Sequence, residues 1–277
     1  MTAPCACLIG WPAAHSRSPV IHKYWLKSFG IDGDYRIEAV KPQDFAGFVT
    51  SLGARGYVGA NVTLPHKEQA LKVADADARA RAVGAANTLW FDGGTLRATN
   101  TDVEGFVGNL DEASPGWDNA TDEALVLGAG GAARAIVFGL VERGIKTIHL
   151  VNRTLPRAEE LARQFGPSVK PAAWDRIAAL MPRATLLVNT TSLGMKGQPP
   201  LDLDLDLLPA AATVVEAVYI PLDTPLLIAA RKRGLKTADG LGMLLHQAVR
   251  GFSLWFGKRP SVTPELRALV EMDLTKA

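Results

Sequence analysis

A short glycine cluster follows a run of apolar residues near the middle of the chain. Gly128 and Gly130 precede the small Ala133 at the start of an alanine-rich helical pattern, so the order is strand, turn and helix. This G-x-G-x-x-A pattern is typical of dinucleotide-binding folds, because glycine permits a tight turn and lets backbone N–H groups approach a pyrophosphate. Glycines of an ordinary βα turn are the alternative, and the flanking elements favour the dinucleotide site.

The residues after the next predicted strand, 147–151, should contact the ribose of such a ligand. Asn152, Arg153 and Thr154 stand where NAD-binding proteins usually carry an acidic residue for the 2′-hydroxyl. A guanidinium can instead pair with a 2′-phosphate. Arg153 alone would suggest a solvated loop, but Arg157 lies four residues further on and favours phosphate binding. The sequence therefore predicts NADP, rather than NAD, as the cofactor.

A second set of polar residues lies in the N-terminal part of the chain. Ser16 and Ser18 precede Pro19 at a predicted helix start, where a serine either caps the helix or helps to bind a carboxylate. These residues alone leave both interpretations open. Lys67 is consistent with a solvated helix start or with a role in chemistry, and Asp102 can simply cap the helix that follows it.

Alternating strands and helices position both sets of residues. Strands at 5–9, 34–40 and 57–63, with helices at 18–29 and 42–52, predict a parallel βαβαβ unit followed by a hairpin over 86–100. Asn61, Thr63 and Lys67 then lie at or just after the carboxyl end of the third strand, where parallel sheets bind ligands. The second alternation comprises strands 124–127, 147–151, 185–188, 213–218 and 235–238, with helices 131–143, 156–165 and 224–233. A long apolar helix over 240–257 and a last helix from residue 264 complete the chain, whereas 201–206 is expected to be a surface excursion.

These elements predict an α/β protein of two domains, with the active-site cleft between them. Residues 1–110 form a parallel-sheet substrate domain and residues 111–239 a Rossmann-type NADP-binding domain. The polar segment 111–123, which is rich in turn-forming residues, is the candidate linker.

The composition excludes several other classes of protein. A length of 277 residues favours two domains, and a net charge of +2 without a basic block argues against nucleic-acid binding. Neither a membrane span nor a secretory signal is visible, so we expect a cytoplasmic protein. Cys5 and Cys7 lie on one face of a strand and should be buried, reduced thiols. The five histidines follow no metal-binding pattern, so no metal is expected.

Nine motifs, in one order along nearly the whole chain, resemble those of the shikimate dehydrogenase family. They are HSRSP (15–19), GANVTLPHK (59–67), GAANT (84–88), NTDVEGF (100–106), GAGGAA (128–133), NRT (152–154), NTTSLGM (189–195), VYIPLDTPLL (218–227) and GLGMLLHQA (240–248). The resemblance implies an NADP-dependent oxidoreductase that reversibly reduces 3-dehydroshikimate to shikimate, a step of chorismate and aromatic amino-acid biosynthesis. It also implies that the helices over 240–277 complete the first domain.

The resemblance assigns roles to individual residues. Lys67 and Asp102 would form the catalytic pair. The substrate carboxylate would be held by Ser16, Ser18, Thr63 and Tyr219, and the substrate hydroxyls by Asn61, Asn87, Asp102 and Gln247. The implied cofactor-binding residues are Gly128, Ala129, Gly130, Gly131, Ala132, Asn152, Arg153, Thr154, Arg157, Thr190, Ser192, Met195, Val218, Gly240 and Met243.

Two departures from the family pattern leave alternatives open. The chain has Glu216 where the family usually has Asp, and Lys23 where it usually has Asn. A paralogue that acts on quinate or aminoshikimate is therefore an alternative, although Ser18 favours shikimate, because relatives that accept quinate tend to replace that serine. A non-catalytic NADP-binding sensor is the alternative from another class, and Lys67, Asp102 and Gln247 argue against it. Whether the protein is a monomer or a homodimer stays open.

Overall fold

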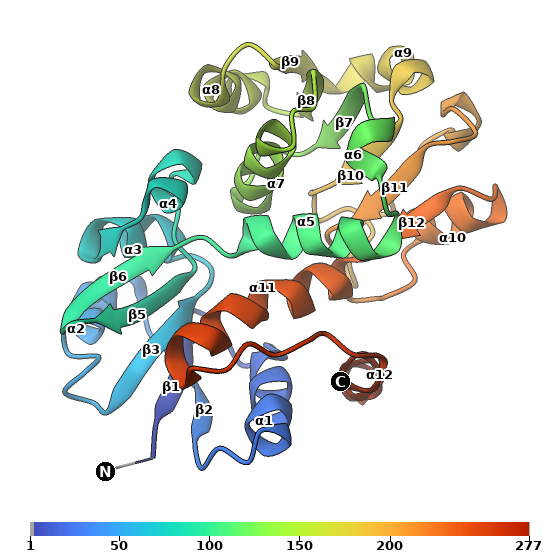
Figure 1. Ribbon diagram of the computed structural model, residues 1–277. Helices are drawn as coiled ribbons and strands as arrows, with labels where there is room; N and C mark the ends of the chain where they lie inside the picture. Colours follow the sequence, from blue (N-terminus) through green and yellow to red (C-terminus); the bar gives the residue numbers. More distant parts are fainter. Residues whose placement is uncertain (1–2, 277) are drawn as a thin grey trace. The chain divides into compact units, whose positions relative to one another are not determined.

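The computed structural model describes residues 3–276 and divides the chain into two compact units (Figure 1). The first unit contains the chain up to Thr101 and again from Leu245, and the second unit contains Asp102–Leu244. Both units are α/β, which confirms the predicted fold class. The sequence placed the two boundaries after residues 110 and 239, whereas helix α5 (Asp102–Ala113) and the first turn of helix α11 (Gly240–Phe256) belong to the second unit.

The first unit is built on a six-stranded sheet of order β2-β1-β3-β5-β6-β4. Its strands are β1 (Cys5–Gly10), β2 (Asp34–Ala39), β3 (Tyr57–Val62), β4 (Asp75–Ala76), β5 (Thr88–Asp92) and β6 (Thr95–Thr99). Strand β1 pairs in parallel with β2 and β3, whereas β5 is antiparallel to β3. Strands β5 and β6 form the predicted hairpin, which Gly93 and Gly94 close. The sheet is therefore mixed, and the prediction of a parallel sheet for this domain was wrong for its β5–β6 part. The helices of this unit are α1 (Ser18–Ser28), α2 (Phe45–Thr50), α3 (Lys67–Val73), α4 (Ala78–Val83) and α12 (Pro264–Leu274), with a short 3-10 helix, η1 (Pro42–Asp44).

The two faces of strand β1 are packed against different helices. Cys5, Cys7 and Ile9 share one face and belong to a core that includes Phe45 of helix α2. Ala6 and Leu8 point to the opposite face, where Trp255 of helix α11 covers them. Both cysteines are buried free thiols, as expected, and burial raises the pKa of Cys7.

The second unit is an all-parallel, six-stranded sheet of order β12-β11-β10-β7-β8-β9. Its strands are β7 (Glu123–Leu127), β8 (Thr147–Asn152), β9 (Val169–Ala173), β10 (Leu186–Asn189), β11 (Thr213–Glu216) and β12 (Lys236–Ala238). Its helices besides α5 are α6 (Trp117–Ala120), α7 (Gly131–Glu142), α8 (Leu155–Phe165), α9 (Ile177–Leu180) and α10 (Pro225–Lys232), with 3-10 helices η2 (Trp174–Arg176), η3 (Met181–Arg183) and η4 (Leu205–Leu207).

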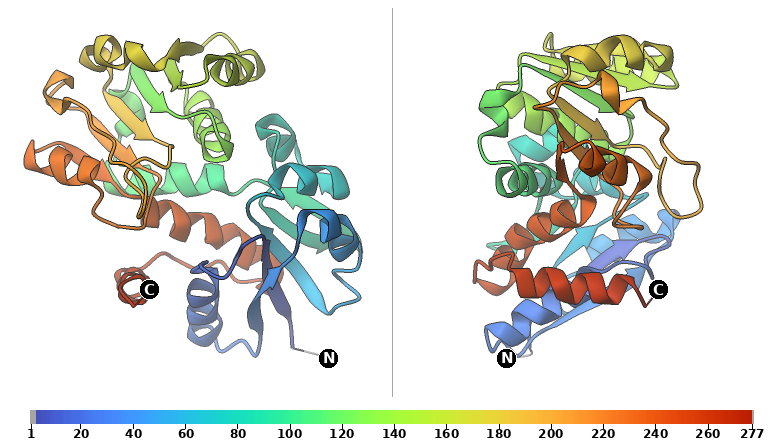
Figure 2. Two further views of the ribbon diagram at one scale, coloured as in Figure 1. Left: turned by 180° about the vertical axis from the view of Figure 1, so that it is seen from behind. Right: turned by 90° about the vertical axis from the view of Figure 1, so that its right-hand side faces the viewer.

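Helices cover both faces of this second sheet, as Figures 1 and 2 show. Val126 of the central strand β7 packs with helices α5, α7 and α8, and the next residue, Leu127, packs on the opposite face with α9 and α10. Burial on both faces explains why the sequence of β7 is a continuous apolar run.

Several short elements had no clear signal in the sequence. Strand β9 contains Pro171 and lies at the edge of the sheet, where proline is tolerated although it cannot donate to the ladder.

Residues 201–206 form no strand, in agreement with the predicted excursion, and Leu201 and Leu205 are buried. Within residues 3–276, no helix has both the length and the apolar character needed to traverse a bilayer.

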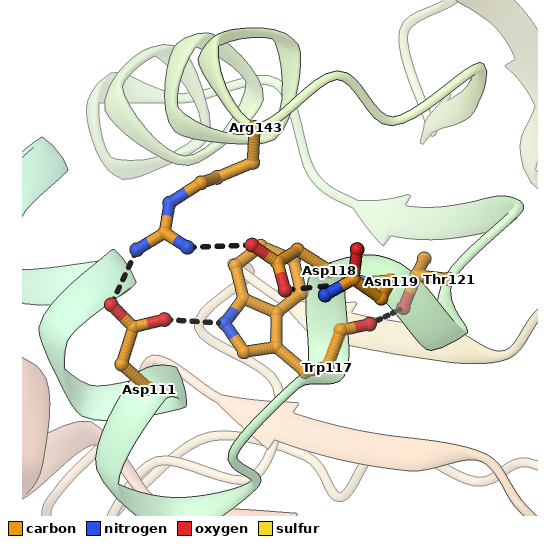
Figure 3. Close-up of polar contacts among 6 residues, drawn as sticks. All are labelled: Asp111, Trp117, Asp118, Asn119, Thr121 and Arg143. Carbon is orange, nitrogen blue, oxygen red and sulfur yellow. Dashed lines mark hydrogen bonds and ion pairs between the residues drawn. The ribbon is translucent and has the colours of Figure 1, made fainter.

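The polar segment 111–123 is anchored, which the prediction of a linker did not anticipate. Arg143, after the end of helix α7, forms ion pairs with Asp111 and with Asp118, the latter at 2.6 Å (Figure 3). The indole of the buried Trp117 donates a hydrogen bond to Asp111 at 2.9 Å, and the Arg143 guanidinium lies 5.8 Å from the centre of that ring. Thr121 closes α6 by donating to the Trp117 carbonyl at 2.7 Å. One arginine thus holds the start and the middle of the segment beside the end of helix α7.

We expect Arg143→Ala to lower the free energy of unfolding by about 1–2 kcal/mol, because two partly exposed ion pairs and a cation–π contact are lost together. Urea unfolding at neutral pH measures the change. Lys146→Ala is the matched control, since Lys146 forms one fully exposed ion pair, with Asp122, and its removal should have almost no effect. Equal losses in the two variants would contradict the anchoring role of Arg143.

Candidate active site

Two serines are paired at the start of helix α1. The Ser16 hydroxyl donates to the Ser18 hydroxyl at 3.1 Å, and the Ser18 backbone N–H donates to the Ser16 hydroxyl at 3.2 Å. The helix begins at Ser18 itself, with Arg17 as an N-cap residue that makes no side-chain cap. The capping interpretation of Ser18 is therefore wrong, because Ser18 lies one position inside the helix. The buried Ser18 hydroxyl lies instead beside the hydroxyl of Ser16.

The turn after strand β3 places Lys67 at the start of helix α3. The Thr63 N–H donates to the Ile9 carbonyl at 2.9 Å, which ties the turn to strand β1. The buried His66 ring donates through Nε2 to the carbonyl of Val40 at 2.8 Å, so the turn is also tied to the end of strand β2. Lys67 follows as the first residue of α3 and is half-buried. Hydrogen bonds to two neighbouring strands thus fix where this lysine leaves the backbone.

The three amide side chains predicted to bind substrate lie in one buried hydrogen-bond network. The Asn87 Oδ1 atom accepts from the Thr101 N–H at 2.7 Å and from the Thr88 hydroxyl at 3.1 Å. The Asn61 Nδ2 atom donates to the Thr88 hydroxyl at 3.2 Å. The Thr101 hydroxyl donates to Gln247 Oε1 at 3.5 Å, which connects helix α11 to the network. All five side chains are less than one tenth exposed.

Sequence reasoning missed Thr88 and Thr101, which connect these amides. Each lies directly beside a predicted residue, Thr88 after Asn87 and Thr101 before Asp102, so the quoted motifs contained them. Asp102 is buried and opens helix α5, which assigns it, like Tyr219, to the second unit.

The glycine cluster of the second unit forms a tight turn after strand β7. Gly128 has φ +103°, and a Cβ atom there would lie 2.6 Å from the Thr190 hydroxyl, so both conformation and packing require glycine. The Gly128 N–H donates to the Val151 carbonyl at 2.8 Å, and Thr190 donates to the Leu127 carbonyl through N–H and hydroxyl, both at 2.8 Å. These bonds join the ends of three neighbouring strands, β8, β7 and β10.

Nothing within residues 3–276 requires glycine at the next two positions. Gly130 is the N-cap of helix α7 with an ordinary extended conformation, and Gly131 opens the helix. A Cβ atom at either position would meet nothing within 4 Å. Ala133, by contrast, is fully buried against the sheet. Exposed glycines at a helix N-terminus leave space for a ligand against the free N–H groups, so this turn fits a pyrophosphate. Ala129 lies between Gly128 and Gly130, and Ala132 lies between Gly131 and Ala133, so the whole turn consists of small residues.

The turn after strand β8 fits a phosphate group. The Asn152 amide donates to the Thr154 carbonyl at 2.9 Å and closes the turn. Arg153 and Arg157 are exposed, and neither forms an ion pair with any of residues 3–276. The turn over 152–154 contains no carboxylate that could bind a ribose 2′-hydroxyl. Among the described residues there is also no group of three or more His, Cys, Asp or Glu side chains that could hold a metal ion.

A buried carboxylate joins the loops that follow strands β10 and β11. The Asn189 Nδ2 atom lies within hydrogen-bonding distance of both oxygens of Glu216, at 2.9 and 3.0 Å. The Val218 N–H donates to the same carboxylate at 3.1 Å and the Thr224 hydroxyl at 3.2 Å. Thr224 is also the N-cap of helix α10. Glu216 therefore holds together two loops and a helix start.

These two loops and the start of helix α11 carry further residues predicted to bind cofactor. Met195 is 40% exposed, Val218 is buried, and Gly240 lies against the main chain, since a Cβ atom there would be 2.6 Å from the Val218 carbonyl oxygen. Met243 packs on the core of the second unit. Thr190 and the exposed Ser192 precede Met195 in the same loop.

The second departure from the family pattern, Lys23, lies in helix α1 of the first unit and forms an exposed ion pair with Asp34.

Burial raises the pKa of Glu216 to about 7, although hydrogen bonds from Asn189, Val218 and Thr224 favour the ionised form. In the unfolded chain the carboxyl group titrates near its ordinary value of 4.5. The folded state therefore binds this proton more tightly. Its contribution to stability is complete below about pH 4.5 and is lost as the pH rises through about 7.

We expect the stability of the wild type relative to Glu216→Gln to fall by about 3 kcal/mol between pH 4.5 and pH 8, because glutamine mimics the protonated carboxyl group and does not titrate. Urea unfolding of both proteins at several pH values gives this difference. A difference that does not change with pH would contradict the raised pKa of Glu216.

Comparison with protein families covers both units. The family model described as "Shikimate dehydrogenase substrate binding domain" matches residues 8–89, and "Shikimate / quinate 5-dehydrogenase" matches residues 112–194. The "Shikimate 5'-dehydrogenase C-terminal domain" matches residues 240–269. The resemblance seen in the motifs is thereby confirmed.

Individual relatives agree with the family models. The NADP(+) shikimate dehydrogenase of Rhodopseudomonas palustris strain BisB18 is 70% identical over 98% of this chain and 98% of its own length. A crystal structure of shikimate 5-dehydrogenase from Thermus thermophilus, in complex with NADP(H) and shikimate, is 34% identical with a TM-score of 0.85 and covers 99% of both chains. Quinate dehydrogenase from Corynebacterium glutamicum, in complex with NAD, is 31% identical with a TM-score of 0.90 over 97% of this chain and 98% of its own. The chain described here belongs to the shikimate dehydrogenase family.

Proposed function

We propose that this protein catalyses the reversible, NADP-dependent interconversion of 3-dehydroshikimate and shikimate. The observation that carries the proposal is the buried network of Asn61, Asn87 and Gln247. Asn61 lies at the carboxyl end of strand β3, and Lys67 follows that strand at the start of helix α3. Neutral amides suit a substrate with several hydroxyl groups, because each can donate and accept hydrogen bonds. The relative that is 70% identical bears the name of this activity.

The substrate carboxylate and hydroxyl groups bind to different side chains in this proposal. Hydroxyl groups of Ser16, Ser18, Thr63 and Tyr219 donate to the carboxylate, and the start of helix α1 favours an anion near the first two. The substrate hydroxyls bind to Asn61, Asn87, Asp102 and Gln247. Ser18 favours shikimate over quinate, since quinate carries an additional hydroxyl at the carbon that bears the carboxylate.

Lys67 performs the proton transfer in the proposed reaction. NADPH, when bound, supplies the hydride that reduces the ketone. The Lys67 ammonium group donates a hydrogen bond to the carbonyl oxygen, stabilises the charge that develops there and delivers the proton. In the oxidation of shikimate, the same amine accepts the proton from the hydroxyl group. Asp102 accepts a hydrogen bond from the reacting part of the substrate and so orients it.

The second unit holds the cofactor through its strand-end turns. The backbone N–H groups at Gly130 and Gly131 bind the pyrophosphate at the start of helix α7, in the turn formed with Gly128, Ala129 and Ala132. Asn152, Arg153, Thr154 and Arg157 bind the 2′-phosphate. The nicotinamide end of the cofactor contacts Thr190, Ser192, Met195, Val218, Gly240 and Met243.

The proposal is tested by following the absorbance of NADPH with shikimate, quinate and aminoshikimate, each with NADP and with NAD. The highest kcat/KM should be obtained with shikimate and NADP. A preference for quinate with NAD would favour the paralogue. Binding of NADPH without turnover of any of these acids would indicate a sensor.

We expect Lys67→Met to lower kcat by about 10²- to 10⁴-fold with little change in the KM for shikimate, because methionine keeps the apolar stem but cannot transfer a proton. Steady-state kinetics at saturating NADP measure both constants. Lys72→Met changes an exposed lysine in the last turn of the same helix and should leave them unaltered. A folded Lys67→Met enzyme with most of its kcat would refute the proton-transfer role.

We expect Arg153→Ala to raise the KM for NADP about tenfold or more and to leave the KM for NAD nearly unchanged, because the variant loses a charge-assisted contact that only NADP can make. Both values come from shikimate oxidation. Arg163→Ala, which removes an exposed arginine from the last turn of helix α8, controls for a general change of surface charge. Equal rises for the two cofactors would rule out the 2′-phosphate assignment.

A further inference from the structure

Tyr35 contacts the buried network of Asn61, Asn87 and Gln247 from strand β2, which is an edge strand of the first sheet. Its hydroxyl group donates a hydrogen bond to Asn61 Oδ1 at 2.7 Å, and the side chain is completely buried. Tyr35 belongs to strand β2, and Asn61 to strand β3, so strand β1 lies between them. The hydrogen bond therefore crosses over strand β1.

Small residues make this reach possible. Ala6 of strand β1 is paired with Tyr35 on one side and with Gly59 on the other, which places the three residues in one row on one face. Neither Ala6 nor Gly59 has a side chain that would block the ring. Asn61 follows Gly59 by two residues and points to the same face. The tyrosine ring can thus extend along the sheet to the amide.

Aromatic neighbours hold the ring in place. The imidazole of His22 stacks on Tyr35 with a centroid distance of 4.1 Å and an interplanar angle of 15°. The Trp255 ring lies 6.0 Å from Tyr35 and is fixed by an indole N–H that donates to the Leu89 carbonyl at 2.8 Å. A Cβ atom on Gly59 would collide with that indole. The position of the hydroxyl group is therefore determined by packing that does not involve the substrate.

Asn61 depends on this hydroxyl group for its orientation. The amide nitrogen donates to the Asn87 main-chain carbonyl at 3.3 Å as well as to Thr88, and a carbonyl can only accept. The amide oxygen must therefore face Tyr35, which is its donor. Burial raises the pKa of Tyr35 well above its ordinary value, so the hydroxyl group keeps its proton under assay conditions. Loss of that donor would leave the buried Asn61 oxygen with only the His22 imidazole beside it.

We propose that Tyr35 is a positioning residue for substrate binding, which fixes the Asn61 amide in the orientation that receives a substrate hydroxyl. This inference rests on the proposed function. It adds to the site a residue that need not touch the substrate and that no motif contains. The hydroxyl group acts on the affinity for the acid, and not on the affinity for the cofactor.

The test compares Tyr35→Phe with Tyr57→Phe. Tyr57 is the matched control, because it lies in the same sheet, is buried and donates its hydroxyl group to Glu38 instead of a network residue. Tyr35→Phe keeps the ring stack and should raise the KM for shikimate about tenfold, with kcat within about threefold of the wild type and the KM for NADP unchanged. Tyr57→Phe should leave all three constants unchanged.

A double-mutant cycle with Asn61→Ala separates positioning from a general structural effect. If Tyr35 acts through Asn61, Tyr35→Phe should cause no further rise in KM once the amide is absent. An unchanged KM for shikimate in Tyr35→Phe, or equal rises in the presence and absence of Asn61, would overturn the inference while leaving the proposed function intact. A wild-type protein that neither binds nor oxidises shikimate would overturn both.

Discussion

Neutral polar side chains that are buried in the first unit constrain its structure strongly, because a buried amide or hydroxyl group must keep its hydrogen bonds. Asn87 satisfies this requirement by accepting from the Thr101 N–H and from Thr88, and the bond from Thr101 joins the two ends of the β5–β6 hairpin. Asn61 satisfies it through Thr88 on one side and Tyr35 on the other. Groups held in this way lose little entropy when a ligand binds, since their orientation is already fixed.

The second unit positions its loops by different means. Backbone bonds at Gly128 and Thr190 tie the strand ends together on the side of the glycine turn, and the Glu216 carboxylate does the same for the loops after β10 and β11. A carboxylate with several donors gives strong contacts but incurs a desolvation cost, which its raised pKa reflects. The first unit thus uses neutral groups where the second uses one ionisable group.

The sequence contained the parts of this structure that depend on local chemistry. Gly128 could be assigned to a tight turn, and the two faces of β7 could be read as a buried parallel strand, because conformation and burial leave a pattern along the chain. Ser18 was less certain, since a shift of one residue in the helix start decides whether it can cap. Strand β9 was missed because Pro171 conceals it.

Contacts between distant segments could not be predicted from local patterns. The bond between Tyr35 and Asn61 requires the register of three strands and small residues at Ala6 and Gly59, which no window of the sequence reveals. The anchoring of segment 111–123 similarly depends on Arg143, which lies beyond the next strand and helix. The polar composition of that segment was visible, but its partner was not.

The chain passes back from the second unit to the first between Leu244 and Leu245, within the continuous helix α11. Dissection of the gene at that point would leave five residues of the helix on one fragment, fewer than an isolated helix needs to persist in water. The other fragment would begin with Leu245, whose side chain is completely buried in the intact protein. An engineer who wanted the dinucleotide-binding half alone would therefore have to redesign its end at Leu244, whereas an enzyme whose halves meet in a loop could simply be cut.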